Sequence, residues 1–152
     1  MRTIGSAMVL AIAASAAAVA ADSETSVCGA DYGPPVDFIA ASYERLQGSG
    51  SPPAAGGVIY TGRLNALFDE SADRLGFGFW VDGQDWLIDD VSVTGRDVWG
   101  REDRRVVEAR FTNFGEPRDL RFYFDRTREG CWQIDDVAGD GWTLSLLLKY
   151  PA

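Results

Sequence analysis

The spacing of apolar residues changes near Gly76, and this change constrains the fold more than any other feature of the sequence. Before Gly76, apolar residues recur at intervals of three and four, which is typical of one face of a helix. After it they alternate with polar residues, as in strands with one buried face. The pattern predicts helices over 36–46 and 61–75, then strands over 86–93, 105–114, 118–126 and 131–137. Residues 144–148 are too few to decide between a last strand and a helical turn.

Helices followed by a run of strands predict an α+β domain, in which two N-terminal helices pack on the concave face of a curved antiparallel meander sheet. Strand 118–126 shows the alternation most clearly, because Leu120, Phe122 and Phe124 are separated by polar residues. The Gly, Ser, Pro and Ala residues of 48–57 predict a loop between the helices. A sheet curled in this way forms a cone, and the cone could hold a pocket.

The first 21 residues have the features of a signal peptide, since Arg2 precedes an alanine-rich apolar run from Met8 to Ala20 that ends in small residues. The run is short for a membrane span, and no cysteine follows it directly. We therefore expect cleavage, no stable membrane anchor, and a periplasmic or secreted protein. The rest of the chain divides into a flexible N-terminal segment, 22–33, and a single α+β domain, 34–150.

Composition excludes several kinds of function. The chain has no histidine, which excludes triads with an imidazole base and metal sites that need histidine ligands. Removing the signal peptide takes Arg2 from the 14 basic residues and leaves 13 against 23 acidic ones, a net charge of −10. Such a charge repels a phosphate backbone, so we expect no nucleic-acid partner. We also expect no metal and no cofactor. The alternating charges of 101–105 predict an exposed turn.

The two cysteines, Cys28 and Cys131, suit one structural disulfide in an oxidising compartment, because they form neither a CxxC motif nor a metal cluster. Cys28 lies in a Ser, Thr and Gly-rich stretch. A free thiol or an intermolecular bridge therefore remains an alternative at this point.

Several motifs resemble an uncharacterised family of small exported bacterial proteins with the nuclear transport factor 2-like, or cystatin-like, cone fold. The resemblance spans 34–148 and implies the fold and the compartment, but no activity, since the family has none established. Many members look lipid-anchored, and this chain lacks the anchoring cysteine. The wider fold includes isomerase-like and cyclase-like enzymes as well as non-catalytic binders. The motifs are the Pro-Val-Asp-Phe-Ile start of the first helix, Asp82-Gly83-Gln84-Asp85-Trp86, the glycine before 131–137 with that segment itself, and the closing leucine-rich stretch.

The aspartates after residue 80 allow three interpretations. Those next to glycine, Asp82 and Asp140, are typical of turns. A calcium loop over 136–141 is a weaker alternative, because no glutamate stands at the last ligand position. In the third, an aspartate in the cone acts as a general base beside a tyrosine that polarises a carbonyl oxygen.

The candidate catalytic residues are Asp90 and Asp136 with Tyr43 and Tyr60. A purely structural role explains the paired aspartates of the last predicted strand equally well. In that role Asp135 or Asp136 bonds a helix end or pairs with Arg63 or Arg74.

Aromatic residues gather just after the second helix, where a pocket rim is expected. We predict a binding surface there, formed by Phe77, Phe79, Trp80, Asp82, Asp85 and Trp86. The sequence as a whole favours an exported, non-enzymatic binding domain of the cell envelope, with a small apolar ligand or an envelope protein as partner. An inhibitor-like or immunity-like role would fit its size and acidity. The alternatives are a pocket enzyme of isomerase, dehydratase or cyclase type with an aspartate base, and an assembly role as a homodimer.

Overall fold

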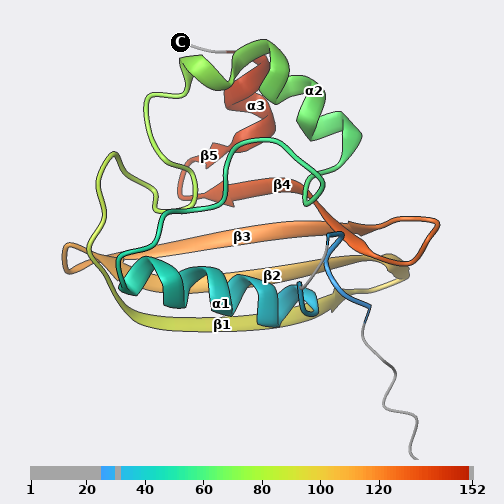
Figure 1. The fold of residues 1–152 in the computed structure, drawn as a ribbon, viewed down its shortest axis with the longest axis horizontal. Coiled ribbons are helices and arrows are strands. Elements are labelled where there is room, and N and C mark those ends of the chain that lie inside the picture. Colours follow the sequence, from blue (N-terminus) through green and yellow to red (C-terminus); the bar gives the residue numbers. More distant parts are fainter. Residues whose placement is uncertain (1–24, 30–31, 151–152) are drawn as a thin grey trace, which may run out of the picture.

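The computed structural model describes residues 25–29 and 32–150. An α+β fold is confirmed: helices come first and an antiparallel meander sheet follows, with strand order β1-β2-β3-β4-β5 (Figure 1). The predicted signal peptide, 1–21, lies outside the described residues. In chain order the elements are α1 (Pro35–Gln47), α2 (Gly62–Ser71), a 3-10 turn (Ala72–Arg74), β1 (Ile88–Val98), β2 (Arg101–Asn113), β3 (Glu116–Arg126), β4 (Trp132–Gly139), β5 (Trp142–Thr143) and α3 (Leu144–Lys149).

The sheet buries one face, as the alternation predicts. Leu120, Phe122 and Phe124 of β3 are buried, and so are the residues that face them across the β2 pairing, such as Ala109 and Val107. The undecided segment 144–148 is helical. Both turns predicted from Asp-Gly pairs are present, and the second of them joins β4 to β5.

The prediction of an exposed turn over 101–105 is wrong. The turn is Trp99-Gly100, and the charged residues belong to β2. Arg101 and Asp103 lie on the same side of the strand, and their side chains form an ion pair at 2.8 Å. Arg105 forms an ion pair with Asp97 across the β1–β2 hairpin at 3.2 Å. Charged residues can therefore continue a strand at its solvated end, because cross-strand and same-face partners compensate them.

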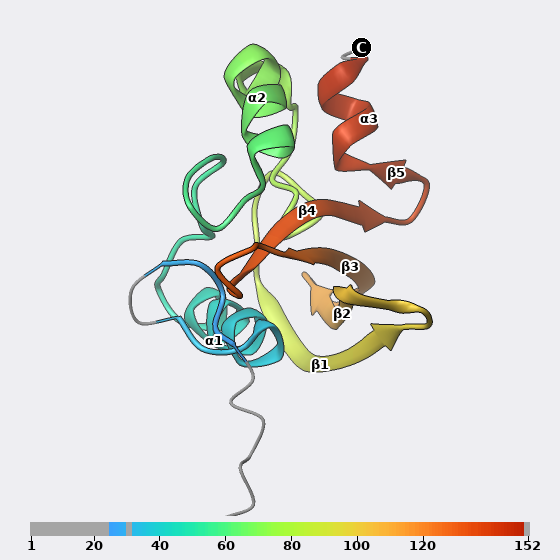
Figure 2. The same cartoon turned by 90° about the vertical axis from the view of Figure 1, so that its right-hand side faces the viewer.

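Helix α1 lies on the concave face of the sheet, against β1 and β2 (Figure 2). Pro35 at the first turn presets the helical φ, and Phe38, Ile39 and Tyr43 point into the core. Helix α2 departs from the expectation that both helices share this face: it packs mainly against α3 and also contacts β4. The reason is that the apolar face of α2, with Leu64 and Phe68, is buried in the same cluster as Leu144 and Leu148 of α3.

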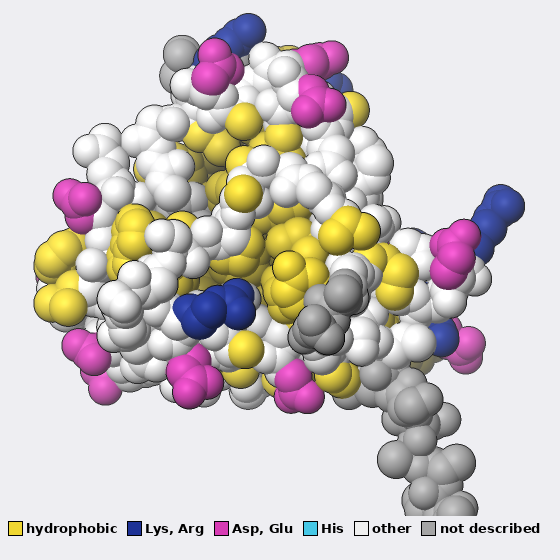
Figure 3. Space-filling view, viewed as in Figure 1, with side chains coloured by type: hydrophobic (Ala, Val, Ile, Leu, Met, Phe, Trp, Pro, Cys, Tyr) yellow, Lys and Arg dark blue, Asp and Glu magenta, His cyan; other side chains and the backbone are white. Residues whose placement is uncertain are grey.

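The interior of the curled sheet is filled by aromatic side chains. Trp80 is 1% exposed, and its ring centroid lies 4.7 Å from that of Phe122 and 6.2 Å from that of Tyr43. Tyr43 in turn lies 4.9 Å from Phe111. The expected pocket in the cone is therefore occupied by the protein's own core. On the face seen in Figure 3, hydrophobic side chains show between α1 and α2, and most charged side chains lie toward the margin.

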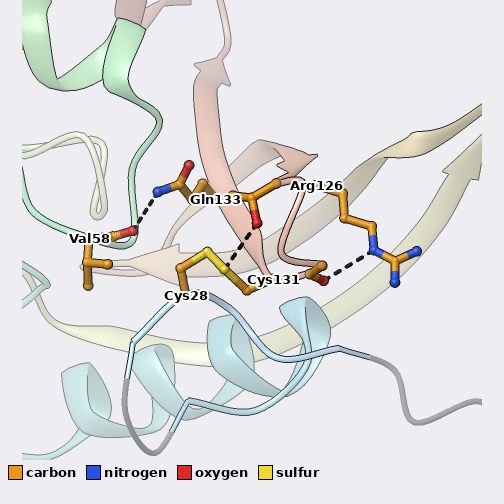
Figure 4. Close-up of a disulfide and its surroundings, with 7 residues drawn as sticks. Cys28, Val58, Arg126, Cys131 and Gln133 are labelled. Atoms are coloured by element: carbon orange, nitrogen blue, oxygen red, sulfur yellow. Dashed lines mark hydrogen bonds between the residues drawn. A yellow bond between two sulfur atoms is a disulfide. The ribbon is translucent and has the colours of Figure 1, made fainter.

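Cys28 and Cys131 form a disulfide within the chain, so the alternatives of a free thiol and an intermolecular bridge are wrong (Figure 4). The bridge joins the N-terminal segment to the start of β4. Beside it Val27 is buried, and the Cys28 N–H donates to the Trp132 carbonyl at 2.9 Å. The described part of the segment predicted to be flexible is thus held against β4.

Candidate functional site

The loop 76–86 forms one wall of an apolar hollow on the surface. Its base is closed by Gly78 and Gly83, since the Gly78 N–H donates to the Gly83 carbonyl at 2.8 Å. Between them Asp82 adopts a left-handed conformation with φ 49°, which aspartate tolerates better than most residues. The Gln84 amide also donates to the Gly76 carbonyl at 3.1 Å. These bonds give the loop a defined shape.

The opposite wall comes from the C-terminal hairpin and α3. The Trp142 ring meets that of Phe77 edge to face at a centroid distance of 5.1 Å, and its Nε1 donates to Asp82 Oδ1 at 3.0 Å. A Cβ added to Gly139 would overlap the Trp142 indole, so the glycine lets the ring lie across the backbone. With Leu147 these residues line a hollow of about 380 Å³ that is wide open to solvent.

The hollow combines apolar walls with a few polar groups. Phe77, Trp142 and Leu147 are each half-buried and supply its apolar surface, and Gln84 and Asp82 supply the polar one. Asp82 Oδ2 also lies 3.6 Å from Arg118 Nε, so its charge is partly compensated. This composition is typical of sites that bind small molecules, in which apolar contact gives affinity and a few polar groups orient the ligand.

The predicted binding residues divide between this hollow and the core. Phe77 and Asp82 line the hollow. Phe79 and Trp80 are buried in the core, so the prediction that they form a binding surface is wrong. Trp86 is half-buried against the core, and Asp85 is exposed.

Sequence reasoning missed both apolar residues of the opposite wall, Trp142 and Leu147, and the polar Gln84. Trp142 was assigned no role, and Leu147 lay in the segment 144–148, whose structure was undecided. The turn after Gly139 reverses the chain. A prediction that the residues after this turn return toward the loop 76–86 could have been based on it.

The candidate catalytic tyrosines are parts of the core. The Tyr43 hydroxyl donates to the Trp80 carbonyl at 2.7 Å, and the Tyr60 hydroxyl accepts from Trp80 Nε1 at 3.2 Å. Burial, together with the charge of Asp82, holds the pKa of Tyr43 well above its usual value. Burial also raises the pKa of Tyr60, although the bond from Trp80 acts in the opposite direction. Both hydroxyls are thus neutral and already engaged.

The candidate catalytic aspartates lie elsewhere. Asp90 is exposed at an irregularity of β1, where its φ is 51°. Asp136 Oδ1 accepts from the Ser145 N–H at 3.0 Å at the start of α3, and its other oxygen accepts from the Ser145 hydroxyl. Within the described part of the chain, no hydrogen bond joins either aspartate to Tyr43 or Tyr60. The helix-end role foreseen for Asp136 is confirmed, and the four residues do not form one site.

Asp135 is the centre of an ion-pair cluster that fastens α2 to the sheet. Its Oδ1 accepts from Arg63 Nε at 3.1 Å and from the Thr61 hydroxyl at 2.9 Å, and its Oδ2 accepts from Arg104 at 3.0 Å. Arg104 also pairs with Asp125 at 2.8 Å. Burial acts to raise the pKa of Asp135, but the bonds from Arg63 and Thr61 and the arginine charges outweigh it, so the pKa is lowered. The cluster therefore contributes to stability.

Replacing Asp135 with asparagine is expected to lower the free energy of unfolding by about 1.5–3 kcal/mol at pH 7, the range for hydrogen bonds to charged groups. Because the folded-state pKa of Asp135 is depressed, its contribution is complete above the unfolded pKa of about 3.9 and is lost as the pH falls toward the folded value. In urea unfolding, the difference in the free energy of unfolding between the wild type and Asp135→Asn should thus be smaller at pH 3 than at pH 7. Asp103→Asn, in an exposed ion pair, is the control and should change little. Equal losses for both variants, or a loss independent of pH, would contradict the role assigned to Asp135.

A second, larger groove of about 900 Å³ runs over the outer face of the sheet and also includes Asp82. Its walls carry arginines and acidic residues in similar numbers, and Arg110 pairs with both Glu108 at 2.6 Å and Asp119 at 3.3 Å. Such mixed, mutually compensated charges are typical of a solvated sheet face. The apolar hollow is therefore the better candidate site.

No protein-family model and no curated protein matches the chain. Among solved structures, there is a partial likeness to the phospholipid-binding protein from Ralstonia solanacearum, determined in complex with a phospholipid. The two are 19% identical with a TM-score of 0.37, over 75% of this chain and 60% of that one. The chain thus spans less than two thirds of that protein's length. A TM-score this low establishes no shared fold, and the nuclear transport factor 2-like cone stays a prediction. None of the described helices is both long and apolar enough to cross a bilayer.

Proposed function

We propose that this chain is an exported, non-enzymatic binding domain that takes a small apolar ligand into the hollow between Phe77, Trp142 and Leu147. The observation that carries the proposal is the convergence of these three apolar side chains from two distant segments around a space of about 380 Å³. That volume lies within the range of small-molecule sites. Because the loop wall is closed by its own hydrogen bonds, little ordering would be needed on binding.

Export is supported by the signal-like first 21 residues and by the disulfide, which persists in oxidising compartments. A binding role without catalysis is supported by the state of the candidate catalytic groups. The buried tyrosines already have partners, and Asp136 holds the start of α3.

Binding is tested with N-phenyl-1-naphthylamine, an uncharged apolar dye whose fluorescence rises when it leaves water. The wild-type protein should give a saturable titration. Leu147→Ser should weaken binding about tenfold or more, since burying a leucine is worth about 1.5–3 kcal/mol. Gly139→Ala should also weaken it by displacing the Trp142 ring.

The matched control is Leu146→Ser, because Leu146 is the neighbouring leucine of α3, is exposed, and does not line the hollow. It carries the same change in helix propensity and should leave the titration unaltered. Far-ultraviolet circular dichroism confirms that each variant is folded. Absence of saturable binding to the wild type, or equal weakening by the two serine variants, would rule out the hollow as the site.

A further inference from the structure

Two large apolar side chains are exposed next to each other at the end of the sheet where β2 turns into β3. Leu87 is 57% exposed and Phe114 is 60% exposed. They are neighbours, since the Phe114 N–H donates to the Leu87 carbonyl at 3.0 Å. Neither lines the hollow described above. We refer to this pair as the Leu87–Phe114 patch.

A buried side chain holds the patch in place. Asn113 accepts from the Leu87 N–H at 2.9 Å, and its amide donates to the carbonyls of Val81 and Asp85, both at 3.1 Å. Its Cα pairs with that of Ile88, so the same residue fixes the end of the loop and the start of β1. The patch is thus presented on a rigid support, which lowers the entropy cost of a contact with another molecule.

The conformation of Phe114 is costly for a phenylalanine. Phe114 and Gly115 form a two-residue hairpin turn with φ 50° and φ 79°, and such turns favour asparagine before glycine. A bulky residue at positive φ costs on the order of 1–2 kcal/mol. Since the Phe114 side chain is exposed, burial within the chain offsets little of this cost. A contact with another molecule would account for an aromatic residue at this position.

The charges around the patch select the kind of partner. Asp85, Asp89 and Glu116 are exposed within two residues of Leu87 or Phe114. None of these three forms an ion pair with another described residue. The arginines nearest to Phe114 in sequence have other partners, since Arg110 pairs with Glu108 and Asp119 and Arg118 pairs with Asp82. An acidic border disfavours a second copy of this chain and an anionic membrane surface, and it attracts positive charge.

We propose that the Leu87–Phe114 patch binds a protein segment in which an apolar side chain is flanked by lysine or arginine. The apolar side chain packs on Phe114 and Leu87, and the basic residues lie against the acidic border. This proposal does not depend on the hollow, because the two sites share no residue.

The probe is a short fluorescein-labelled peptide of alternating lysine and leucine, with binding followed by fluorescence anisotropy. Phe114→Asn should weaken binding about tenfold or more without impairing the fold, because asparagine suits the turn and the net charge is unchanged. The double variant Asp89→Asn/Glu116→Gln should also weaken binding and should reduce its dependence on sodium chloride. A peptide with glutamate in place of lysine should not bind.

Trp99→Asn is the matched control, since Trp99 is 99% exposed and also precedes a glycine in a hairpin turn, at the far end of the sheet. It should leave peptide binding unchanged. Equal loss in both aromatic variants, no binding to the wild type, or binding of the glutamate peptide would overturn the proposal. Two other results would also overturn the proposal. The wild type could dimerise, or it could bind phosphatidylglycerol vesicles, and Phe114→Asn could abolish that interaction. Either result would assign the patch to another occupant.

Discussion

Trp80→Ala is expected to lower the free energy of unfolding by about 3–5 kcal/mol, the range for removal of a large buried aromatic side chain. The Trp80 ring contacts those of Phe38, Tyr43 and Phe122, so its loss opens a cavity between α1 and the sheet. It also removes the indole N–H that donates to the buried Tyr60 hydroxyl. The cavity and the unpaired hydroxyl both act against the folded state.

Denaturant unfolding followed by circular dichroism measures this effect. Trp80→Phe should lower the free energy of unfolding by less than Trp80→Ala, because phenylalanine keeps much of the ring volume. Some loss should remain, since the Tyr60 hydroxyl is still without its donor. Trp99→Ala is the exposed control and should change the free energy of unfolding by no more than about 0.5 kcal/mol. A loss below about 1 kcal/mol for Trp80→Ala would mean that Trp80 is not a core residue.

Much of the fold could be predicted because its signals are local. The alternation of Leu120, Phe122 and Phe124 follows from the pleat of a strand that has one buried face, and β3 is such a strand. Pro35 and the apolar spacing after it define α1 in the same way. Turns are equally local, since Asp-Gly pairs supply the backbone conformations that turns need.

The site was harder to predict because it depends on which distant segments meet. The glycines around Phe79 and Trp80 indicate a loop, but a loop can fold back into the core. Whether an aromatic residue in it is buried depends on partners such as Phe122, which lies more than forty residues further along the sequence. The hollow likewise needs Trp142 beside Phe77, a contact between the C-terminal hairpin and the loop. The aspartates of β4 show the same limit in part. The pairing of Asp135 with Arg63 was one of the predicted alternatives and is confirmed, whereas its second partner, Arg104 of β2, lies on a distant segment that no local pattern connects to it.

Removing the disulfide in a Cys28→Ser/Cys131→Ser variant is expected to lower the free energy of unfolding by about 2–5 kcal/mol. The bridge spans a sequence separation of 103 residues, and a closed loop of that length restricts the unfolded chain strongly. Most other contacts remain in the variant, including the buried Val27 and the hydrogen bonds between the N-terminal segment and β4. The loss should therefore arise largely from the greater freedom of the unfolded state.

The matched comparison is the wild-type protein unfolded in urea with and without a phosphine reductant. The reduced wild type and the double variant should have the same midpoint, below that of the oxidised protein. Hydrogen exchange should locate the change: the amide of Cys28, which bonds the Trp132 carbonyl, should lose protection first, whereas amides of β2 and β3 should lose it only with global unfolding. If the oxidised and reduced proteins unfolded at the same urea concentration, the bridge would add nothing to stability. The hydrogen bonds and the burial of Val27 would then account by themselves for the attachment of the N-terminal segment to β4.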